Sequence, residues 1–272
     1  MFDLVICHGP NDNNILDYNL KYNSKTVDYR NVYVITHDPN LRRDDCIVVH
    51  ESIFPFNKEH FNAFIPNIRP EHLKRRGWYL QQLLKLYAWK YIDGLLPDYL
   101  VIDCDTIFIK KTEFFKDGKY LFNYAKNNTG PRGNHQPNAN WLHEPYFEHI
   151  NNMLPSFKKF SNEISGICHH MLFSKNIIKE IFEVIEKQHN NKYQFWEIFI
   201  KNINVKEFCK SMASEYELYF HYIFTFHNDK VELRRLNWID DVSTLNQLNS
   251  ILQKGLQEDV NYVSCHWWRN GR

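Results

Sequence analysis

The chain has 272 residues, of which 43% are hydrophobic, 16% aromatic and 24% charged. A chain of this size buries a sizeable core as one large domain or two small ones, and its aromatic content excludes a disordered or collagen-like protein. Because 33 Lys and Arg face 32 Asp and Glu, the formal net charge is +1, and no overall field attracts nucleic acid or an anionic membrane.

The first half of the chain alternates predicted strands and helices. Strands are predicted at 2–7, 31–36 and 46–50, with a helix at 14–22 after the first of them. A long helix opened by Pro70 is predicted at 71–91, and a buried strand interrupted by two carboxylates at 99–109. This alternation predicts an α/β fold with a Rossmann-like, mainly parallel sheet flanked by helices, which binds ligands at the carboxyl ends of its strands.

The second half of the chain is expected to be mixed α/β. A polar loop at 126–145 precedes a strand at 164–173 and helices at 177–188, 195–203 and 215–226. A strand at 231–236, a helix at 244–254 and a closing strand from 262 complete the chain. No repeat or composition break marks a linker, so residues 1–272 are expected to form a single domain.

Cysteine usage and the N-terminus indicate the compartment. The six cysteines are scattered without a C-x-x-C pair, and most lie in apolar, strand-like stretches, so we expect reduced thiols. The chain shows no signal-type cleavage site and no apolar run near the roughly 18 residues of a spanning helix. We therefore expect a cytoplasmic protein without a membrane span.

Asp103 and Asp105 form the first candidate site. Side chains repeat with period 2 on a strand, so both carboxylates are expected on one face of the strand at 99–109. Two adjacent carboxylates suit a hard cation such as Mn²⁺ or Mg²⁺. The alternative is a pair of solvated carboxylates at a strand end.

The helix at 71–91 has an unusual second face. Opposite its apolar stripe lie Trp78, Gln81, Gln82, Lys85 and Trp89, where a solvated face would be mostly charged. Basic residues at 74–76 near its N-terminus favour anions. The face is either the wall of a site for a phosphorylated ligand or one side of a helix sandwiched between two layers.

Histidine and glutamate supply further candidates. His169 and His170 are adjacent on a predicted strand, so they point to opposite faces, and at most one serves a given site. Ser214 and Glu217 form a capping box, which accounts for Glu217 structurally. Glu215 falls at the first helical position, where the helix dipole keeps it ionised, as a proton acceptor requires; a plain dipole-stabilising Glu is the alternative.

The last residues include His266 and Trp267. His266 is a candidate late metal ligand, or part of a closing strand. Trp faces stack on the C–H side of sugars, and seven Trp is a large number for this length.

Taken together, these stretches resemble the metal-dependent glycosyltransferases of the GT-A class, which use nucleotide sugars as donors. The resemblance rests on residues 5–12, 77–85, 102–108, 165–171 and 213–217. More narrowly, the chain is similar to a domain-of-unknown-function family of large DNA viruses and some microbes, and to the small cytosolic glycosyltransferases of chlorella viruses that build capsid glycans.

The resemblance implies a GT-A-like single domain with a nucleotide-sugar-binding half at 1–125 and an acceptor-binding half at 126–272. It implies Mn²⁺ or Mg²⁺ held by Asp103, Asp105 and His266. The implied nucleotide-binding residues are His8, Gly9, Asn11, Asp12, Gln81 and Lys85. The implied sugar- or acceptor-binding residues are Gln82, His169, His170, Glu217 and Trp267.

The resemblance also implies a reaction. The donor is a UDP-sugar, with UDP-xylose as the specific expectation, the acceptor is a hydroxyl of a glycan, and the location is the host cytosol for a viral protein. Glu215 matches the catalytic base of inverting members, although Tyr216 stands where their usual Asp would be. Two alternatives stay open: a nucleotidyltransferase, which needs a Gly-rich phosphate loop where this chain has only Gly9, and a non-catalytic carbohydrate-binding protein.

Overall fold

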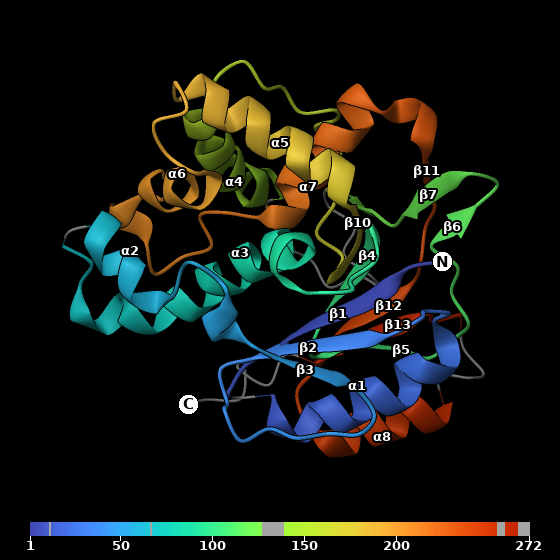
Figure 1. Cartoon of the computed structure of the whole chain (residues 1–272). Coiled ribbons are helices and arrows are strands. Elements are labelled where there is room, and N and C mark those ends of the chain that lie inside the picture. The colour runs from blue at the N-terminus through green and yellow to red at the C-terminus, as the bar shows by residue number, and fades with distance from the viewer. Residues whose placement is uncertain (11, 66, 127–138, 255–258, 266–272) are drawn as a thin grey trace.

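The computed structural model describes residues 1–10, 12–65, 67–126, 139–254 and 259–265. Its centre is a five-stranded sheet in the order β10-β4-β1-β2-β3, in which four strands are parallel and β10 is antiparallel to β4 (Figure 1). The strands are β1 (Asp3–His8), β2 (Val32–Thr36), β3 (Ile47–His50), β4 (Asp98–Asp103) and β10 (His170–Ser174). The expected α/β class with a mainly parallel sheet is confirmed.

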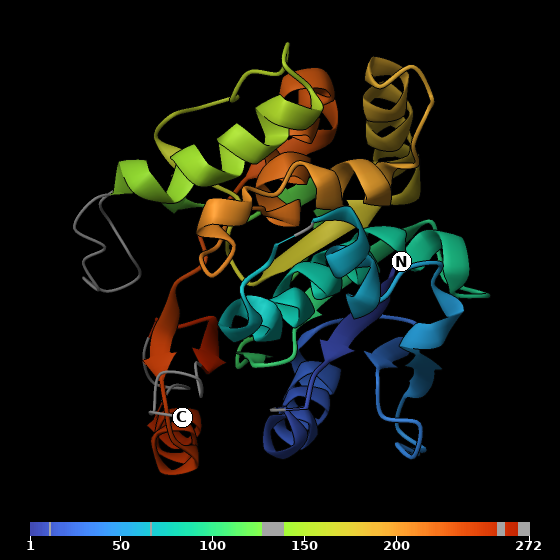
Figure 2. The ribbon, with the colours of Figure 1, turned by 90° about the vertical axis from the view of Figure 1, so that its left-hand side faces the viewer.

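Helices cover the sheets from two sides. Helices α1 (Asn13–Thr26) and α8 (Leu245–Lys254) lie together on one side, at the bottom of Figure 1 and Figure 2. The other side carries α2 (Lys58–Phe64), α3 (Arg76–Tyr91), α4 (Ala139–Met153), α5 (Lys175–Gln188), α6 (Phe195–Lys201) and α7 (Glu215–Phe226). None of the described helices is long and apolar enough to cross a membrane.

Three smaller sheets and four short 3₁₀ turns complete the described structure. The sheet β12-β13-β5 consists of β5 (Thr106–Phe108), β12 (Trp238–Val242) and β13 (Tyr262–Cys265). The others are β11-β7-β6, from β6 (Phe115–Lys116), β7 (Lys119–Phe122) and β11 (Val231–Leu233), and the pair β8 (Ala125–Lys126) and β9 (Ile164–Ser165). The 3₁₀ turns are η1 (Glu51–Ile53), η2 (Pro70–Arg75), η4 (Val205–Glu207) and η5 (Asn228–Lys230).

The alternation of side chains along the central strands divides the core in two. Val5 and Val101 pack into the core that includes α3, α5, α6 and α7. Leu4, Ile6 and Leu100 pack into the core on the side of α1 and α8. Both faces of the central strands are therefore buried, which explains why these strands read as continuous apolar runs in the sequence.

Most predicted elements are present, and α7 has the predicted bounds, but two predicted strands were wrong. The strand at 99–109 is broken by a turn at Cys104 and Asp105, so β4 and β5 belong to different sheets. The strand at 164–173 divides into β9 and β10, and His169 between them has a φ of 62°. In both places a pattern typical of one strand conceals a change of direction of the backbone.

Other differences concern helices. The region at 126–145 was expected to be a loop, but α4 begins at Ala139 inside it. The helix predicted at 71–91 begins as the 3₁₀ turn η2 and becomes α-helical at Arg76. Helix α2 was not predicted. All six cysteines are free thiols, as expected.

Gly166 fixes the distance between the segment after β9 and α7. A Cβ at this position would lie 2.4 Å from Cβ of Phe220 on α7, closer than such atoms approach. The preceding residue, Ser165, donates a hydrogen bond to the buried Glu217 of the same helix. The segment that leads to His169 is therefore held directly against α7.

We expect Gly166→Ala to destabilise the fold by about 1–3 kcal/mol, because the methyl group forces α7 or β9 to move. Gly77→Ala on α3 is the matched control, since its Cβ would meet only the flexible Lys58 side chain at 3.5 Å. The control should leave stability unchanged or raise it by up to about 1 kcal/mol. Urea unfolding measures both variants; equal effects of the two would contradict this close approach.

Candidate functional site

The turn that carries the Asp pair lies at the carboxyl edge of the parallel sheet. Cys7 pairs with Asp103 in the register of β1 and β4. In the sheet, β2 and β3 lie on one side of β1, and β4 lies on the other. The strand order therefore reverses between β1 and β4. Ligands of open α/β sheets bind outside the carboxyl ends of the strands at such a reversal.

Two asparagines of α1 hold this turn in place. Nδ2 of the fully buried Asn19 donates to the carbonyl oxygens of Cys104 and Thr106, both at 2.9 Å, and to that of Asp103 at 3.3 Å. One turn further, Asn23 donates to Oδ1 of Asn19 and accepts from the backbone N–H of Phe108, each at 2.8 Å. Sequence analysis missed both residues; their signal is a pair of Asn at i and i+4 within an otherwise apolar helix face.

Lys85 stands at the centre of the site. Its Nζ is 2.6 Å from Oδ1 of Asp103, 2.7 Å from Oε1 of Glu215 and 3.1 Å from the hydroxyl of Tyr216. The Tyr216 hydroxyl in turn donates to Oδ1 of Asp103 at 2.8 Å. An ammonium group has three protons, so these three acceptors use all of them.

The electrostatics of this cluster set one ammonium against two carboxylates. Burial alone would lower the pKa of Lys85, which is 2% exposed, but Asp103 and Glu215 outweigh it and raise that pKa well above its usual value. Lys85 therefore stays charged. Burial by itself would raise the pKa of Asp103, but the interactions with Lys85 and His169 lower it. For Glu215 burial outweighs the effect of Lys85, so the pKa is raised. With Lys85, Asp103 and Glu215 ionised, one ammonium faces two carboxylates.

The sequence left Lys85 either on the wall of a phosphate site or on a helix sandwiched between two layers. In the structure its partners are carboxylates of β4 and α7. Its neighbour Gln82 is also buried, and Oε1 of Gln82 accepts the backbone N–H of Glu215 at 3.1 Å. Gln81 is half-buried on the adjoining part of α3. Helix α3 is thus sandwiched between layers along most of its length, with a polar stripe that faces the start of α7.

The turn after β1 is closed by its own residues. The backbone N–H of Gly9 donates to Oδ2 of Asp12 at 2.8 Å. His8 is buried at the end of β1, and its Nδ1 lies 3.2 Å from the hydroxyl of Thr36 at the end of β2. Asn11, also expected to bind the nucleotide, lies outside the described residues.

His169 and His170 have different surroundings, although His169 does not lie on a strand as predicted. The left-handed backbone of His169 brings its Nδ1 to 3.3 Å from Oδ2 of Asp103. His170 is buried among the rings of Phe108, Phe114 and Tyr262, and burial lowers its pKa to about 3. Of the two, His169 joins the cluster, and His170 is a neutral core residue.

Glu217 does more than cap a helix. Ser214 accepts the backbone N–H of Glu217 at 3.2 Å, which is half of the expected capping box. The Glu217 carboxylate is fully buried, accepts from Ser165, and lies 2.9 Å from Nε2 of His221. Because Nδ1 of His221 accepts the backbone N–H of Phe160, its proton is on Nε2, facing Glu217.

Asp105 lies on the turn beside the end of β13. Its carbonyl oxygen accepts the backbone N–H of Cys265 at 2.8 Å, and its charge adds to burial in raising the pKa of that thiol. His266 and Trp267 follow Cys265 in sequence but lie outside the described residues. Within the described residues, no group of three His, Cys, Asp or Glu side chains could hold a metal ion by itself.

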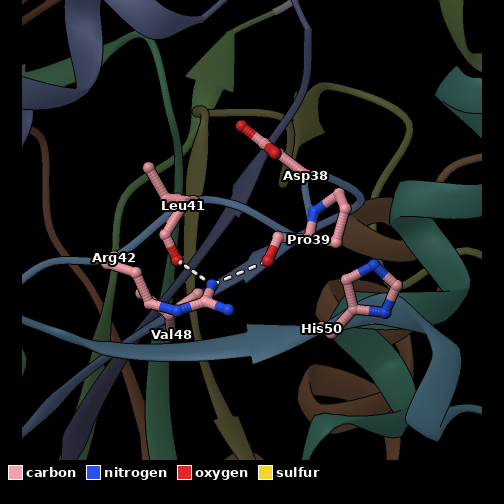
Figure 3. Close-up of a pocket in the computed structure, with 6 residues that line it drawn as sticks. All are labelled: Asp38, Pro39, Leu41, Arg42, Val48 and His50. Atoms are coloured by element: carbon pink, nitrogen blue, oxygen red, sulfur yellow. Dashed lines mark hydrogen bonds between the residues drawn. The ribbon is translucent and has the colours of Figure 1, made fainter.

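A pocket of about 270 Å³ lies at the carboxyl ends of β2 and β3 (Figure 3). It is lined by Asp38, Pro39, Leu41, Arg42, Val48 and His50. Nη1 of Arg42 donates to the carbonyl oxygens of Pro39 and Leu41 at 2.7 and 2.8 Å, which fixes the wall of the pocket. In the strand register His8 pairs with Thr36 and Thr36 with His50, so His50 of the pocket lies two strands from the end of β1.

The chain belongs to a family of unknown function, DUF6492, whose model matches residues 19–259. No curated protein matches the chain. The match includes the Asp pair, Lys85 and Glu215.

We expect Lys85→Met to destabilise the protein by about 3–5 kcal/mol, because it leaves the buried carboxylate of Glu215 and the half-buried one of Asp103 without their cation. Adding Glu215→Gln should recover part of that loss by removing one of the carboxylates. Lys179→Met is the control: it breaks an exposed ion pair with Glu183 and should change stability by less than about 0.5 kcal/mol. Chemical unfolding at pH 7 measures all three; a loss for Lys85→Met as small as for the control would contradict a buried ion cluster.

Proposed function

We propose that this protein is a glycosyltransferase that moves a sugar from a UDP-sugar to a hydroxyl of a glycan acceptor. The observation that carries the proposal is the ionised cluster of Asp103, Lys85 and Glu215 at the carboxyl edge of a parallel sheet, where its strand order reverses. Strongly perturbed carboxylates in such a position are characteristic of sites that handle charge and protons.

The proposed donor lies along the carboxyl edge of the sheet. The pocket beside β2 and β3 would hold the nucleoside, and Asp103 at the end of β4 would face the sugar and diphosphate. Three strand spacings separate β3 from β4, which is about 14 Å. An extended nucleotide sugar could therefore lie along this edge, with its nucleoside near β3 and its sugar near β4. His8 and the turn to Asp12 would lie between the two.

The proposed metal is Mn²⁺ or Mg²⁺. Asp103 and Asp105 supply carboxylate oxygens at a cluster in which one ammonium faces two carboxylates, and Mg²⁺ is commonly held by one or two carboxylates together with substrate phosphates. This donor set fits such a cation once the diphosphate is bound. When bound there, the cation would stabilise the negative charge that develops on the leaving nucleoside diphosphate.

Glu215 is the proposed general base of an inverting transfer. The acceptor oxygen bonds to the anomeric carbon, the bond from that carbon to the diphosphate oxygen breaks, and the acceptor proton passes to Glu215. Lys85 binds Oε1 of Glu215, and we assign the acceptor proton to Oε2. The raised pKa of Glu215 favours this role, because a base works best when its pKa approaches the working pH.

Lys85 acts in this proposal as a positioning residue. Its charge keeps both Asp103 and Glu215 ionised, and its short bonds fix the distance between them. Tyr216 stands where a carboxylate was expected, and its hydroxyl bridges Lys85 and Asp103. It therefore orients the Asp carboxylate instead of supplying a second base.

The turn after β1 favours a glycosyltransferase over a nucleotidyltransferase. A phosphate-cradling loop needs several free backbone N–H groups, which glycine-rich turns provide. In this turn the N–H of Gly9 is already bonded to Asp12.

Glu215→Gln should lower turnover about 10²–10⁴-fold, the usual contribution of proton transfer to a positioned base, and change donor binding by no more than a few-fold. The assay measures UDP released from a panel of UDP-sugars with Mn²⁺, with and without glycan acceptors. Because burial raises the pKa of Glu215, the wild-type rate should fall on acidification at a pH above the ordinary Glu value of 4.5.

Glu232→Gln, an exposed residue of β11, is the control and should leave turnover unchanged. A Glu215→Gln variant that keeps the turnover of the wild type would contradict the role of Glu215. Loss of donor binding in that variant would show that Glu215 binds the donor and would contradict its role in proton transfer.

A further inference from the structure

One stripe of α3 continues from the cluster toward the N-terminus of the helix. Arg75, Trp78, Gln82 and Lys85 are spaced at intervals of three, four and three residues, so they lie on the same side of the helix. Three of them contact the segment that opens α7: Arg75 bonds Ser211, Gln82 bonds Glu215, and Lys85 bonds Glu215 and Tyr216. The stripe therefore faces the start of α7.

Arg75 is a largely buried cation without an ion-pair partner. Its Nη2 donates to Oγ of Ser211 at 2.6 Å, and its guanidinium stacks over the ring of Trp78 at 4.0 Å. Its Nε is buried and has no hydrogen-bond partner, and burial lowers its pKa. Within the described part of the chain, no carboxylate forms a salt bridge with it.

Gln82 presents a second unused donor. Its side chain is 1% exposed, and its orientation is fixed because Oε1 must accept the N–H of Glu215. The amide nitrogen Nε2 is then directed elsewhere and has no hydrogen-bond partner. A buried donor left unpaired costs about 1–3 kcal/mol, so a group that accepts from it would bind favourably.

We propose that Arg75, Trp78 and Gln82 form the acceptor subsite and that the acceptor carries an anionic group, a carboxylate or a phosphate, bound by Arg75. This proposal rests on the proposed function and adds the chemical class of the acceptor. The unused groups of Arg75 and Gln82 are hydrogen-bond donors, so their ligand supplies acceptor oxygens. The guanidinium, which has no carboxylate partner among the described residues, favours an anionic ligand. Trp78 holds the guanidinium of Arg75 in place by stacking against it.

The position of Arg75 assigns it to the acceptor and not to the donor. Ten residues of helix separate Arg75 from Lys85, which is about 15 Å along the helix axis. Asp103, where the donor diphosphate would lie, contacts Lys85. Arg75 therefore lies at the end of the stripe that is farthest from the leaving group. Gln82, which binds the backbone N–H of Glu215, lies between the two.

Saturation-transfer NMR with methyl β-D-glucuronide and methyl β-D-glucoside tests this subsite. The two sugars differ in a carboxylate, and the measurement needs no donor, metal or turnover, so its outcome is independent of the proposed activity. Three variants are compared: Arg75→Gln, Arg75→Lys and the control Arg76→Gln. The guanidinium of Arg76 bonds to the carbonyl oxygens of Leu73 and Lys58, away from the stripe.

We expect the glucuronide to bind at least about tenfold more tightly than the glucoside, since a charged hydrogen bond is typically worth that factor or more. Arg75→Gln should abolish the preference, Arg75→Lys should retain part of it, and Arg76→Gln should retain all of it. Displacement of the glucuronide by inorganic phosphate at lower concentration would identify a phosphorylated acceptor. Equal binding of the two sugars, no binding of either, or an unchanged preference in folded Arg75→Gln would overturn the proposal.

Discussion

The three hydrogen bonds of the Lys85 ammonium join three elements that are far apart in the sequence. Lys85 belongs to α3, Asp103 ends β4, and Glu215 and Tyr216 open α7. Burying an ammonium group is unfavourable unless it is paired and its protons are all bonded, and here both conditions hold. The start of α7 is consequently fixed against the carboxyl edge of the sheet. The Asn19 and Asn23 amides fix the other side of that edge by binding the backbone between β4 and β5.

The same interaction sets the charge of the site. One ammonium lies between two carboxylates at the edge of the sheet, and Asp105 places a third carboxylate on the adjoining turn. A cation would be favoured there, whereas a bare phosphate would be repelled. This charge pattern is the physical basis for expecting a divalent cation with the donor diphosphate, and for assigning anion recognition to Arg75 at the distant end of the α3 stripe.

The sequence was sufficient for the parts of this account that depend on local patterns. The apolar runs of β1, β2 and β4 predicted a parallel sheet, and Ser214 before Glu215 predicted where α7 begins. It was not sufficient where the partner of a side chain is chosen by tertiary structure. The carboxylate partners of Lys85 are 18 and 130 residues away, so the sequence left open whether Lys85 faces phosphate or lies between two layers. The bonds of Asn19 and Asn23 to the backbone between β4 and β5 depend on tertiary structure, and the apolar residues on both sides of Cys104 concealed the turn there.

A thermal-shift panel of UDP, GDP, ADP and CMP, each with and without Mn²⁺, tests most directly whether this edge of the sheet binds a nucleotide donor. The account predicts stabilisation by UDP only when Mn²⁺ is present, with a loss of that shift in Asp103→Asn. A site of this kind stabilises the folded protein by about 2.7 kcal/mol when the ligand is at 100 times its Kd. No shift with any of the four nucleotides, or a UDP shift that is unchanged in Asp103→Asn, would contradict the account.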